Sequence, residues 1–234
     1  MTIHTSVFYV GGSKGGVGKS LFSFALVDHL LGRNANILLV DTDTDNPDVF
    51  KAHKDLALSN LHCCLNNLDD ADGWADLLDT VQNYPDYAVI INAAARTKTS
   101  TSSYGDIMKE ALQEMRRNLT VFWIINRHRD SIELLHSFQE VFTDVPIHVC
   151  RNLYFGEAQR FDMYNTSKAR EMVEKNGMTL DFPVVGTRVA DWLYSKRMSI
   201  HEAYSEMPFG TRAELQRWRA HCAKMFNQVM GEPS

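Results

Sequence analysis

The stretch that decides the fold is residues 6–20, which read Ser-Val-Phe-Tyr-Val-Gly-Gly-Ser-Lys-Gly-Gly-Val-Gly-Lys-Ser. Residues 6–10 are mostly β-branched or aromatic, and such a run is typical of a buried strand. Glycines then cluster, and the apolar pattern of residues 21–31 predicts a helix that begins near Lys19 and Ser20. A strand, a glycine-rich turn and a helix start are the setting in which a phosphate-binding loop occurs. A plain glycine-rich turn would leave the Lys-Ser pair and both flanking elements unexplained.

The chemistry of this loop follows from its residue types. Because glycine lacks a Cβ atom, backbone N–H groups can turn inward around an anion, and the helix N-terminus adds partial positive charge. The Lys19 ammonium is expected to reach the β- and γ-phosphates, and the Ser20 hydroxyl is expected to fill one Mg²⁺ coordination position. The sequence therefore predicts that the loop binds a nucleotide.

One detail of the loop narrows the family. Ser13 stands where the usual phosphate-binding loop has glycine, and Lys14 follows it directly. The heptad Lys14-Gly15-Gly16-Val17-Gly18-Lys19-Ser20 resembles the deviant Walker A box of the ParA/MinD family of dimerising ATPases. The alternative for Lys14 is a solvated loop cation.

This resemblance implies ATP and Mg²⁺ as cofactors, and an ATP-dependent homodimer that encloses the nucleotides. Lys14 would reach across the dimer and touch the phosphates bound by the other subunit, which makes Lys14 and Lys19 candidate catalytic residues. The implied cofactor contacts come from the loop and the first helical turn, at Gly15, Gly16, Val17, Gly18, Lys19, Ser20 and Leu21.

The chain as a whole fits one domain that spans residues 1–234. It is 44% hydrophobic, which is enough to bury a substantial α/β core. A net charge of −5 argues against a surface coated with basic residues for tight, static DNA binding. No apolar run reaches the length of a membrane span and no signal peptide precedes the first strand, so we expect a cytoplasmic protein without membrane attachment. The four cysteines have no metal-type spacing.

A second apolar run, residues 36–40, is typical of a parallel strand covered on both faces. Asp41 and Asp43 follow the carboxyl end of this strand, and open α/β sheets bind their ligands at the carboxyl ends of their strands. The ParA/MinD family has an Asp-x-Asp box here. The resemblance implies that Asp43 is catalytic and positions the attacking water while Asp41 supports magnesium, so Ser20, Asp41 and Asp43 are the candidate metal residues. A calcium-binding EF-hand is excluded, because the required glycine and glutamate are missing from its sixth and twelfth positions.

The strand predicted at residues 87–91 ends in a departure from the family. ParA-type proteins carry a Walker B aspartate there, whereas this chain has Asn92 followed by three alanines. Asparagine keeps an acceptor oxygen but loses the negative charge near the metal. The hypothesis is that ATP binding survives while hydrolysis is slow or needs a partner. The hydroxyl-rich residues 96–103 match in position the mobile switch II segment of relatives, and a flexible connector is the alternative.

The strand predicted at residues 119–125 ends in Asn126 and Arg127. The family commonly has Asn-Arg at this place, and the resemblance implies that the asparagine amide reads the adenine edge. The aspartate by which guanine-specific relatives read their base is missing, which favours ATP over GTP. A turn former that closes the strand remains the alternative for Asn126. Pro183 resembles a residue of the family's loop near the purine, so it joins Asn126 and Arg127 as a candidate cofactor-binding residue.

Further segments complete the secondary-structure prediction. Helices are expected at residues 54–68, 74–81, 106–117, 131–142 and 211–230, and another strand at 147–150. Alternating strands and helices predict an α/β fold, a single doubly wound, mainly parallel sheet with helices on both faces. The resemblance implies the same architecture, the three-layer α/β/α P-loop NTPase fold.

Three functions stay open. The first is an ATP-switched dimer in plasmid partitioning, plasmid maintenance or conjugal DNA transfer, since residues 151–156 resemble a turn of the plasmid-borne TraL and StbB-like proteins. Its partner would be a plasmid-encoded adaptor or DNA-binding protein, or non-specific DNA held by basic residues near the C-terminus (Arg197, Arg212, Arg217 and Arg219). A solvated helical face is the alternative for these arginines. The second function is a metabolic P-loop enzyme, and the third is a nucleotide-bound scaffold that does not hydrolyse ATP.

Overall fold

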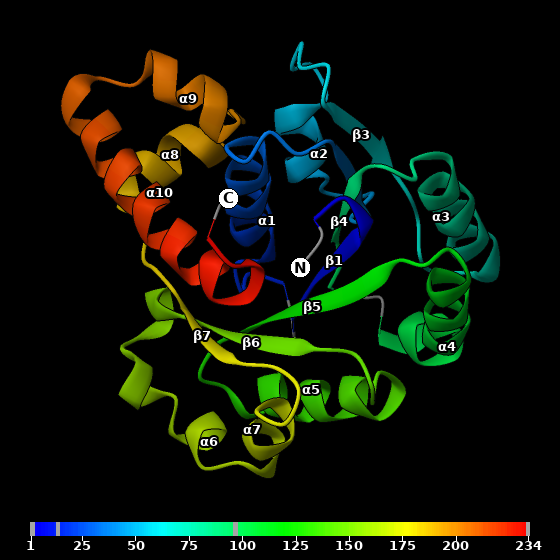
Figure 1. Cartoon of the computed structure of the whole chain (residues 1–234). Helices are drawn as coiled ribbons and strands as arrows, with labels where there is room; N and C mark the ends of the chain where they lie inside the picture. Colours follow the sequence, from blue (N-terminus) through cyan, green and yellow to red (C-terminus); the bar gives the residue numbers. More distant parts are fainter. Residues whose placement is uncertain (1–2, 13–14, 96–97, 233–234) are drawn as a thin grey trace.

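A seven-stranded sheet forms the centre of the molecule, in the order β3-β2-β4-β1-β5-β6-β7 (Figure 1). The computed structural model describes residues 3–12, 15–95 and 98–232. All neighbouring strand pairs of the sheet are parallel. The predicted doubly wound sheet is therefore confirmed. The strands are β1 (Ser6–Gly12), β2 (Ile37–Asp41), β3 (Leu61–Leu65), β4 (Ala88–Asn92), β5 (Asn118–Ile125), β6 (Ile147–Asn152) and β7 (Thr179–Phe182).

Helices cover both faces of this sheet, which gives three layers (Figure 1). Alternate residues of β1 show the division, since Phe8 and Val10 enter one apolar core while Val7 and Tyr9 enter the other. The first core is closed by α1 (Lys19–Leu31), α2 (Asp48–His53), α8 (Thr187–Ser195), α9 (Ile200–Glu206) and α10 (Phe209–Met230). The second is closed by α3 (Ala71–Asn83), α4 (Lys98–Glu114), α5 (Arg129–Val141), α6 (Asp162–Asn165) and α7 (Lys168–Val173).

The prediction of a helix over residues 54–68 is wrong. Residues 61–65 instead form the edge strand β3, which pairs with β2 so that Leu61 lies beside Ile37 and Leu65 beside Asp41. The apolar residues of this segment have a spacing that also suits a helix. The open edge of β2 offers backbone hydrogen-bond partners, and this tertiary pairing overrides the local preference.

Further elements differ from the sequence prediction, among them the short helices α2, α6, α7 and α9, which were not predicted. Strand β7 was not predicted, and it pairs with β6 and leads directly into Pro183. Helix α4 begins at Lys98, inside the hydroxyl-rich segment expected to be a loop, while residues 96 and 97 lie outside the described residues. The remaining predicted strands and helices occur near their expected positions.

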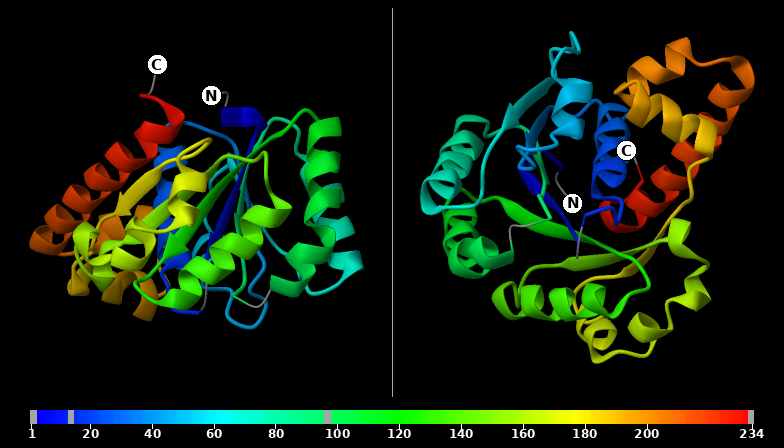
Figure 2. Two further views of the ribbon diagram at one scale, coloured as in Figure 1. Left: turned by 90° about the horizontal axis from the view of Figure 1, so that it is seen from below. Right: turned by 180° about the vertical axis from the view of Figure 1, so that it is seen from behind.

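The parallel sheet brings the candidate site residues to one edge. In the left view of Figure 2 both chain ends lie at the top of the molecule, and the strands run away from them. The carboxyl ends of the strands therefore gather at the opposite edge, where open α/β sheets bind ligands.

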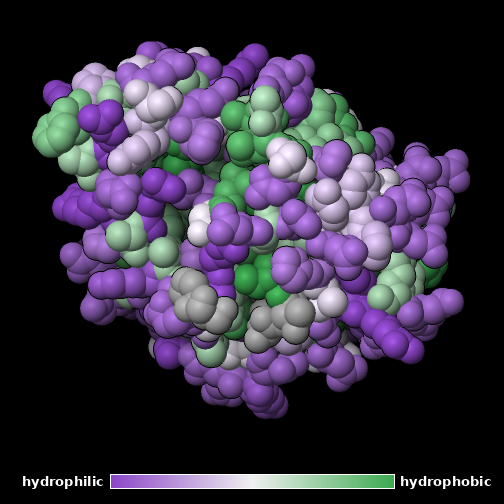
Figure 3. Space-filling view, turned by 45° about the horizontal axis from the view of Figure 1, so that its top comes forward, coloured by the Kyte–Doolittle hydropathy of each residue, from purple (hydrophilic) through white to green (hydrophobic). Residues whose placement is uncertain are grey.

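The face shown in the space-filling view is mostly hydrophilic (Figure 3). Its apolar side chains gather mainly in a patch that runs from the upper right to the centre of this view. Among the described residues, no helix combines the length and the apolar character that crossing a bilayer requires.

Candidate functional site

The glycine-rich loop connects β1 to α1 with the backbone that the sequence predicts. Gly16 has φ +78° and Gly18 has φ +104°, left-handed conformations that favour glycine. Gly18 is the N-cap of α1, so the N-terminus of this helix, with its partial positive charge, adjoins the loop. Lys14 lies outside the described residues, so its reach across a dimer stays a prediction.

Lys19 supplies a buried positive charge at the start of α1. Its side chain is only 9% exposed. Burial lowers the pKa of Lys19 to about 8, and the nearby Asp43 carboxylate opposes this shift. Asp43 itself is half-buried and accepts a hydrogen bond from the Asn46 backbone N–H at 3.1 Å. The buried Lys19 ammonium would attract a phosphate group strongly, because the surroundings screen its charge weakly, whereas the Asp43 carboxylate would repel it.

Asp41 ends β2 fully buried, with both carboxylate oxygens bonded to protein. Its Oδ1 accepts from Asn92 Nδ2 at 2.9 Å and from the Asp43 backbone N–H at 3.3 Å. Its Oδ2 accepts from the Phe50 backbone N–H at 3.1 Å. Burial raises the pKa of Asp41, while these hydrogen bonds act in the opposite direction. Asp41 is thus fully buried and accepts three hydrogen bonds from protein, and its expected role beside a metal-bound water stays a prediction.

Asn92 lies beside Asp41 in the sheet and is 3% exposed. Its Oδ1 accepts from the Ser23 hydroxyl of α1 at 2.9 Å, while its Nδ2 donates to Asp41. Both ends of the amide are therefore engaged, and the side chain links α1 to the end of β2. The acceptor oxygen that the sequence left for a metal-bound water is directed at Ser23 instead.

The Mg²⁺ ion expected at this edge would take few protein ligands. Among the described residues there is no cluster of three histidine, cysteine or acidic side chains that could hold a metal ion. Mg²⁺ in nucleotide sites needs few protein ligands, because phosphates and water complete its octahedral shell. Ser20, in the first turn of α1, and the carboxylates of Asp41 and Asp43 lie at the edge where such an ion would bind.

A cavity of about 340 Å³ adjoins the loop on the β6 side. Gly16, Gly18 and Leu21 form its phosphate-loop wall. The facing wall comes from the end of β6, from the segments after β6 and β7, and from α8 (Asn152, Tyr154, Pro183, Val184, Val185, Thr187, Ala190 and Tyr194). The Pro183 carbonyl accepts a hydrogen bond from Trp218 Nε1 of α10 at 2.9 Å, which fixes this wall. The cavity thus combines loop backbone with apolar and aromatic side chains, as small-ligand sites do.

Asn126 and Arg127 do not line this cavity. The Asn126 Oδ1 accepts from the His128 backbone N–H at 2.9 Å and from the Ser131 hydroxyl at 2.7 Å. This is the geometry of a turn former, the alternative that the sequence left open. The exposed Arg127 instead donates from Nε to the Arg160 carbonyl at 2.9 Å, and so supports the segment after β6.

Asn152 is the site residue that sequence reasoning missed. It ends β6, is 6% exposed, and donates from Nδ2 to the Val17 carbonyl of the loop at 2.9 Å. Its Oδ1 accepts from the Tyr154 backbone N–H at 3.1 Å. The available signal was a third asparagine at a strand end, after Asn92 and Asn126.

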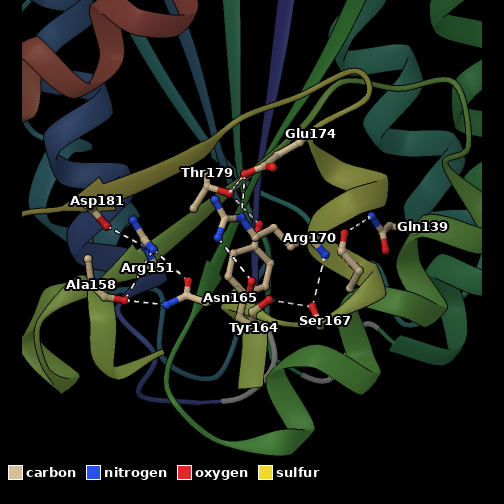
Figure 4. Close-up of polar contacts among 11 residues, drawn as sticks. Gln139, Arg151, Ala158, Tyr164, Asn165, Ser167, Arg170, Glu174, Thr179 and Asp181 are labelled. Carbon is tan, nitrogen blue, oxygen red and sulfur yellow. Dashed lines mark hydrogen bonds and ion pairs between the residues drawn. The ribbon is translucent and has the colours of Figure 1, made fainter. Parts of the chain in front are cut away.

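A polar network supports the segment that follows Asn152 (Figure 4). Arg151 Nε donates to Asp181 Oδ1 at 2.8 Å, and its Nη1 donates to Asn165 Oδ1 at 2.9 Å. Asn165 Nδ2 in turn donates to the Ala158 carbonyl at 2.9 Å. These contacts join β6, β7 and α6, so the cavity wall at Tyr154 rests on a fixed base.

The basic residues near the C-terminus divide into two kinds. Arg197 and Arg217 are exposed. Arg219 donates to Asp28 Oδ2 at 2.8 Å, and Arg212 lies 5.8 Å from the ring centre of Tyr204. Two of the four candidate DNA-contacting arginines are thus already engaged within the protein.

Comparison with known families identifies the class of this site. The CobQ/CobB/MinD/ParA nucleotide binding domain matches residues 8–157, from β1 to the segment after β6. The chain therefore belongs to this family of nucleotide-binding domains, and the predicted ParA/MinD resemblance is confirmed.

Individual relatives agree with this assignment. The chain is 46% identical to Protein MobD of Acidithiobacillus ferrooxidans over 228 residues, which is 97% of this chain and 99% of MobD. Among solved structures, the MinD cell division protein of Aquifex aeolicus has a TM-score of 0.58 at 13% identity, with 97% of each chain covered. The MinC:MinD complex of that organism gives 0.56 at 13% identity, covering 97% of this chain and 96% of the other. At such identity the two structures establish the fold alone.

Proposed function

We propose that this chain is an ATP-dependent, dimerising P-loop ATPase that works as a switch. The observation that carries the proposal is the buried Lys19 ammonium, which begins α1 directly after the left-handed Gly18 and feels the charge of the Asp43 carboxylate. A charge so poorly solvated is stabilised by an anion, and the helix N-terminus adds to this preference.

The proposed roles follow the site. Lys19 and the backbone of residues 15–21 hold the phosphates, and Lys14 reaches the phosphates of a second subunit. Ser20, with Asp41 and Asp43 acting through water, would hold Mg²⁺, whose charge offsets that of the phosphates. Asp43 orients the attacking water. The purine lies in the cavity between Tyr154 and Pro183, where aromatic and apolar groups can stack on a base.

Hydrolysis is proposed to be slow or stimulated by a partner. The support is Asn92, which brings no charge and whose amide is engaged on both sides by Ser23 and Asp41. The same observation favours a second candidate, a nucleotide-binding scaffold with little hydrolysis. Steady-state turnover measured with and without the partner separates them, because the scaffold would show no phosphate release under either condition.

The proposed process is plasmid partitioning, plasmid maintenance or conjugal DNA transfer, in the cytoplasm, with a plasmid-encoded adaptor or DNA-binding protein as partner. Its support is the resemblance of the loop and of residues 151–156 to plasmid-borne relatives. Direct contact with non-specific DNA would fall to the exposed Arg197 and Arg217. Retardation of DNA by the wild-type protein with ATP, lost on replacing both arginines by alanine, would support this contact.

Light scattering with ATP and with ADP tests the proposed switch. The expected result is a doubled mass with ATP and a monomer with ADP. Lys14→Ala should bind ATP yet remain monomeric, and Lys19→Ala should lose ATP binding. A monomer under every condition would instead indicate a metabolic enzyme on the same fold. Undiminished dimerisation of the Lys14→Ala variant would refute the role given to Lys14.

A further inference from the structure

The side chain of Asn152 joins two parts of the site that the chain keeps far apart. Its Nδ2 donates to the Val17 carbonyl, across 135 residues of sequence, at 2.9 Å. Its Oδ1 accepts from the Tyr154 backbone N–H at 3.1 Å. One planar amide therefore fixes the phosphate loop at one end and the base-side wall of the cavity at the other.

The contact between Asn152 and the loop is close. A Cβ atom on Gly18 would lie 2.5 Å from Asn152 Nδ2, so the loop backbone at this point reaches the asparagine only because glycine has no side chain. Val17 and Asn152 are 1% and 6% exposed, so water does not replace their hydrogen bond readily. A movement of Asn152 must therefore move the loop between Val17 and Gly18.

Hydrogen bonds to the backbone of the segment after β6 also hold the base-side wall of the cavity in place. Arg127 donates a hydrogen bond to the Arg160 carbonyl. Asn165 donates to the Ala158 carbonyl and accepts from Arg151 (Figure 4). The segment after β6 is therefore a braced unit, and within it Asn152 provides the contact to the phosphate loop. Tyr154 projects from this segment with 74% of its surface exposed, free to meet a ligand in the cavity.

We propose that Asn152 is a positioning residue that couples the base side of the cavity to the geometry of the phosphate loop. A purine seated against Tyr154 shifts the braced segment after β6 as a unit, and Asn152 transmits that shift to Val17. Triphosphate binding and base binding then strengthen each other. This inference rests on the proposed nucleotide-binding function and adds to it a residue that acts on phosphates without touching them.

Isothermal titration of the full chain with inorganic tripolyphosphate, adenosine and ATP tests the coupling. Asn152→Ala should weaken tripolyphosphate binding about tenfold, the effect of leaving one buried carbonyl unpaired. Adenosine should raise the tripolyphosphate affinity of the wild-type protein and leave that of Asn152→Ala unchanged. A residue that merely stabilises the fold would not alter this linkage.

Two matched variants serve as controls. Asn165→Ala loosens the same segment without touching the loop, and Tyr154→Ala shortens the wall while keeping the backbone N–H. Both should bind tripolyphosphate as the wild type does, and Tyr154→Ala should bind ATP more weakly. If Asn152→Ala folds poorly, Asn152→Ser should show the same loss of tripolyphosphate affinity.

The outcomes separate the coupling from the proposed function. Wild-type tripolyphosphate affinity in a folded Asn152 variant, or an adenosine effect that survives the substitution, overturns the coupling and leaves nucleotide binding intact. A wild-type protein that binds neither ATP nor tripolyphosphate overturns the proposed function and the coupling with it.

Discussion

Two buried asparagines at two strand ends use the same side chain in different ways. Asn92, at the end of β4, bonds two side chains, Ser23 of α1 and Asp41 of β2. Asn152, at the end of β6, bonds two backbone groups, the Val17 carbonyl and the Tyr154 N–H. Each amide donates once and accepts once.

The difference lies in what the partners can do. Around Asn92 they include a buried carboxylate, so a change of charge there has large consequences. Around Asn152 they are neutral backbone groups, so a change there alters loop position rather than electrostatics. We therefore expect Asn92 to govern the stability of the strand ends and Asn152 to govern the geometry of the phosphate loop.

Restoring the family's aspartate should give the largest effect. Asn92→Asp would place a second carboxylate oxygen near Asp41 Oδ1, where the amide nitrogen now lies at 2.9 Å. Without nucleotide, the free energy of unfolding at pH 7 should fall by about 3 kcal/mol, as for a buried charge without a partner. Urea denaturation in the presence of EDTA measures this.

The pH dependence of that variant sharpens the prediction. Repulsion between the two carboxylates raises the pKa of the pair in the folded state, so the folded protein binds a proton more tightly than the unfolded chain. The loss of unfolding free energy in Asn92→Asp, relative to the wild type, should therefore shrink as pH falls and grow as pH rises through the raised pKa. A variant as stable as the wild type at pH 7 would contradict the view that Asn92 is needed beside Asp41.

A methyl group at Gly18 should disturb the other asparagine. Gly18→Ala adds a Cβ atom 2.5 Å from Asn152 Nδ2 at a residue with φ +104°. Strain of this kind is worth about 2 kcal/mol, so tripolyphosphate affinity should fall about thirtyfold. Gly15→Ala is the matched control, because nothing lies within 4 Å of its added Cβ, and it should lose much less affinity. Equal losses in the two variants would argue against a specific contact with Asn152.

Lys19 should give the site a pH dependence that neither asparagine can supply. Its pKa of about 8 means that the free protein loses the ammonium charge as pH rises through that value. Because phosphates bind the charged form, tripolyphosphate affinity should fall about tenfold per pH unit above pH 8, or about 1.4 kcal/mol. Lys19→Arg should remove this slope, since arginine stays protonated, whereas Asn152→Ala should keep it. Titration calorimetry between pH 7 and about pH 9.5 measures the tripolyphosphate affinity of each variant. If the affinity of Lys19→Arg falls with pH as steeply as that of the wild type, Lys19 is not the source of the pH dependence.

The sequence could predict those parts of the site that depend on neighbouring residues. The loop from Gly15 to Ser20 combines glycines, a lysine and a helix start within one segment, so its chemistry is local. Apolar runs likewise revealed β1, β2, β4 and β5, because buried parallel strands are apolar on both faces.

The remainder depends on contacts between distant segments. Asn152 was missed because its partner Val17 lies 135 residues away, and only the strand order brings them together. The spacing of apolar residues in 54–68 suits a helix, yet pairing with β2 makes residues 61–65 a strand. Asn92 was recognised as a departure from the family, but its bonds to Ser23 and Asp41 follow only from the structure.

The smallest expected effect separates the two asparagines most directly. Ser23→Ala removes the donor to Asn92 Oδ1 and leaves that buried oxygen without its partner at 2.9 Å. The free energy of unfolding should fall by about 1 kcal/mol, while tripolyphosphate affinity stays at the wild-type value. Asn152→Ala should show the larger change in affinity.

Ser137→Ala is the control for that serine. Its hydroxyl donates to the Glu133 carbonyl on the exposed side of α5, so its loss should leave both the stability and the affinity unchanged. A Ser23→Ala protein that loses tripolyphosphate affinity as Asn152→Ala does would show that the ends of β4 and β6 act on the phosphate loop together. The division of roles between the two asparagines would then be wrong, because the bond that links α1 to Asn92 would also set the loop geometry.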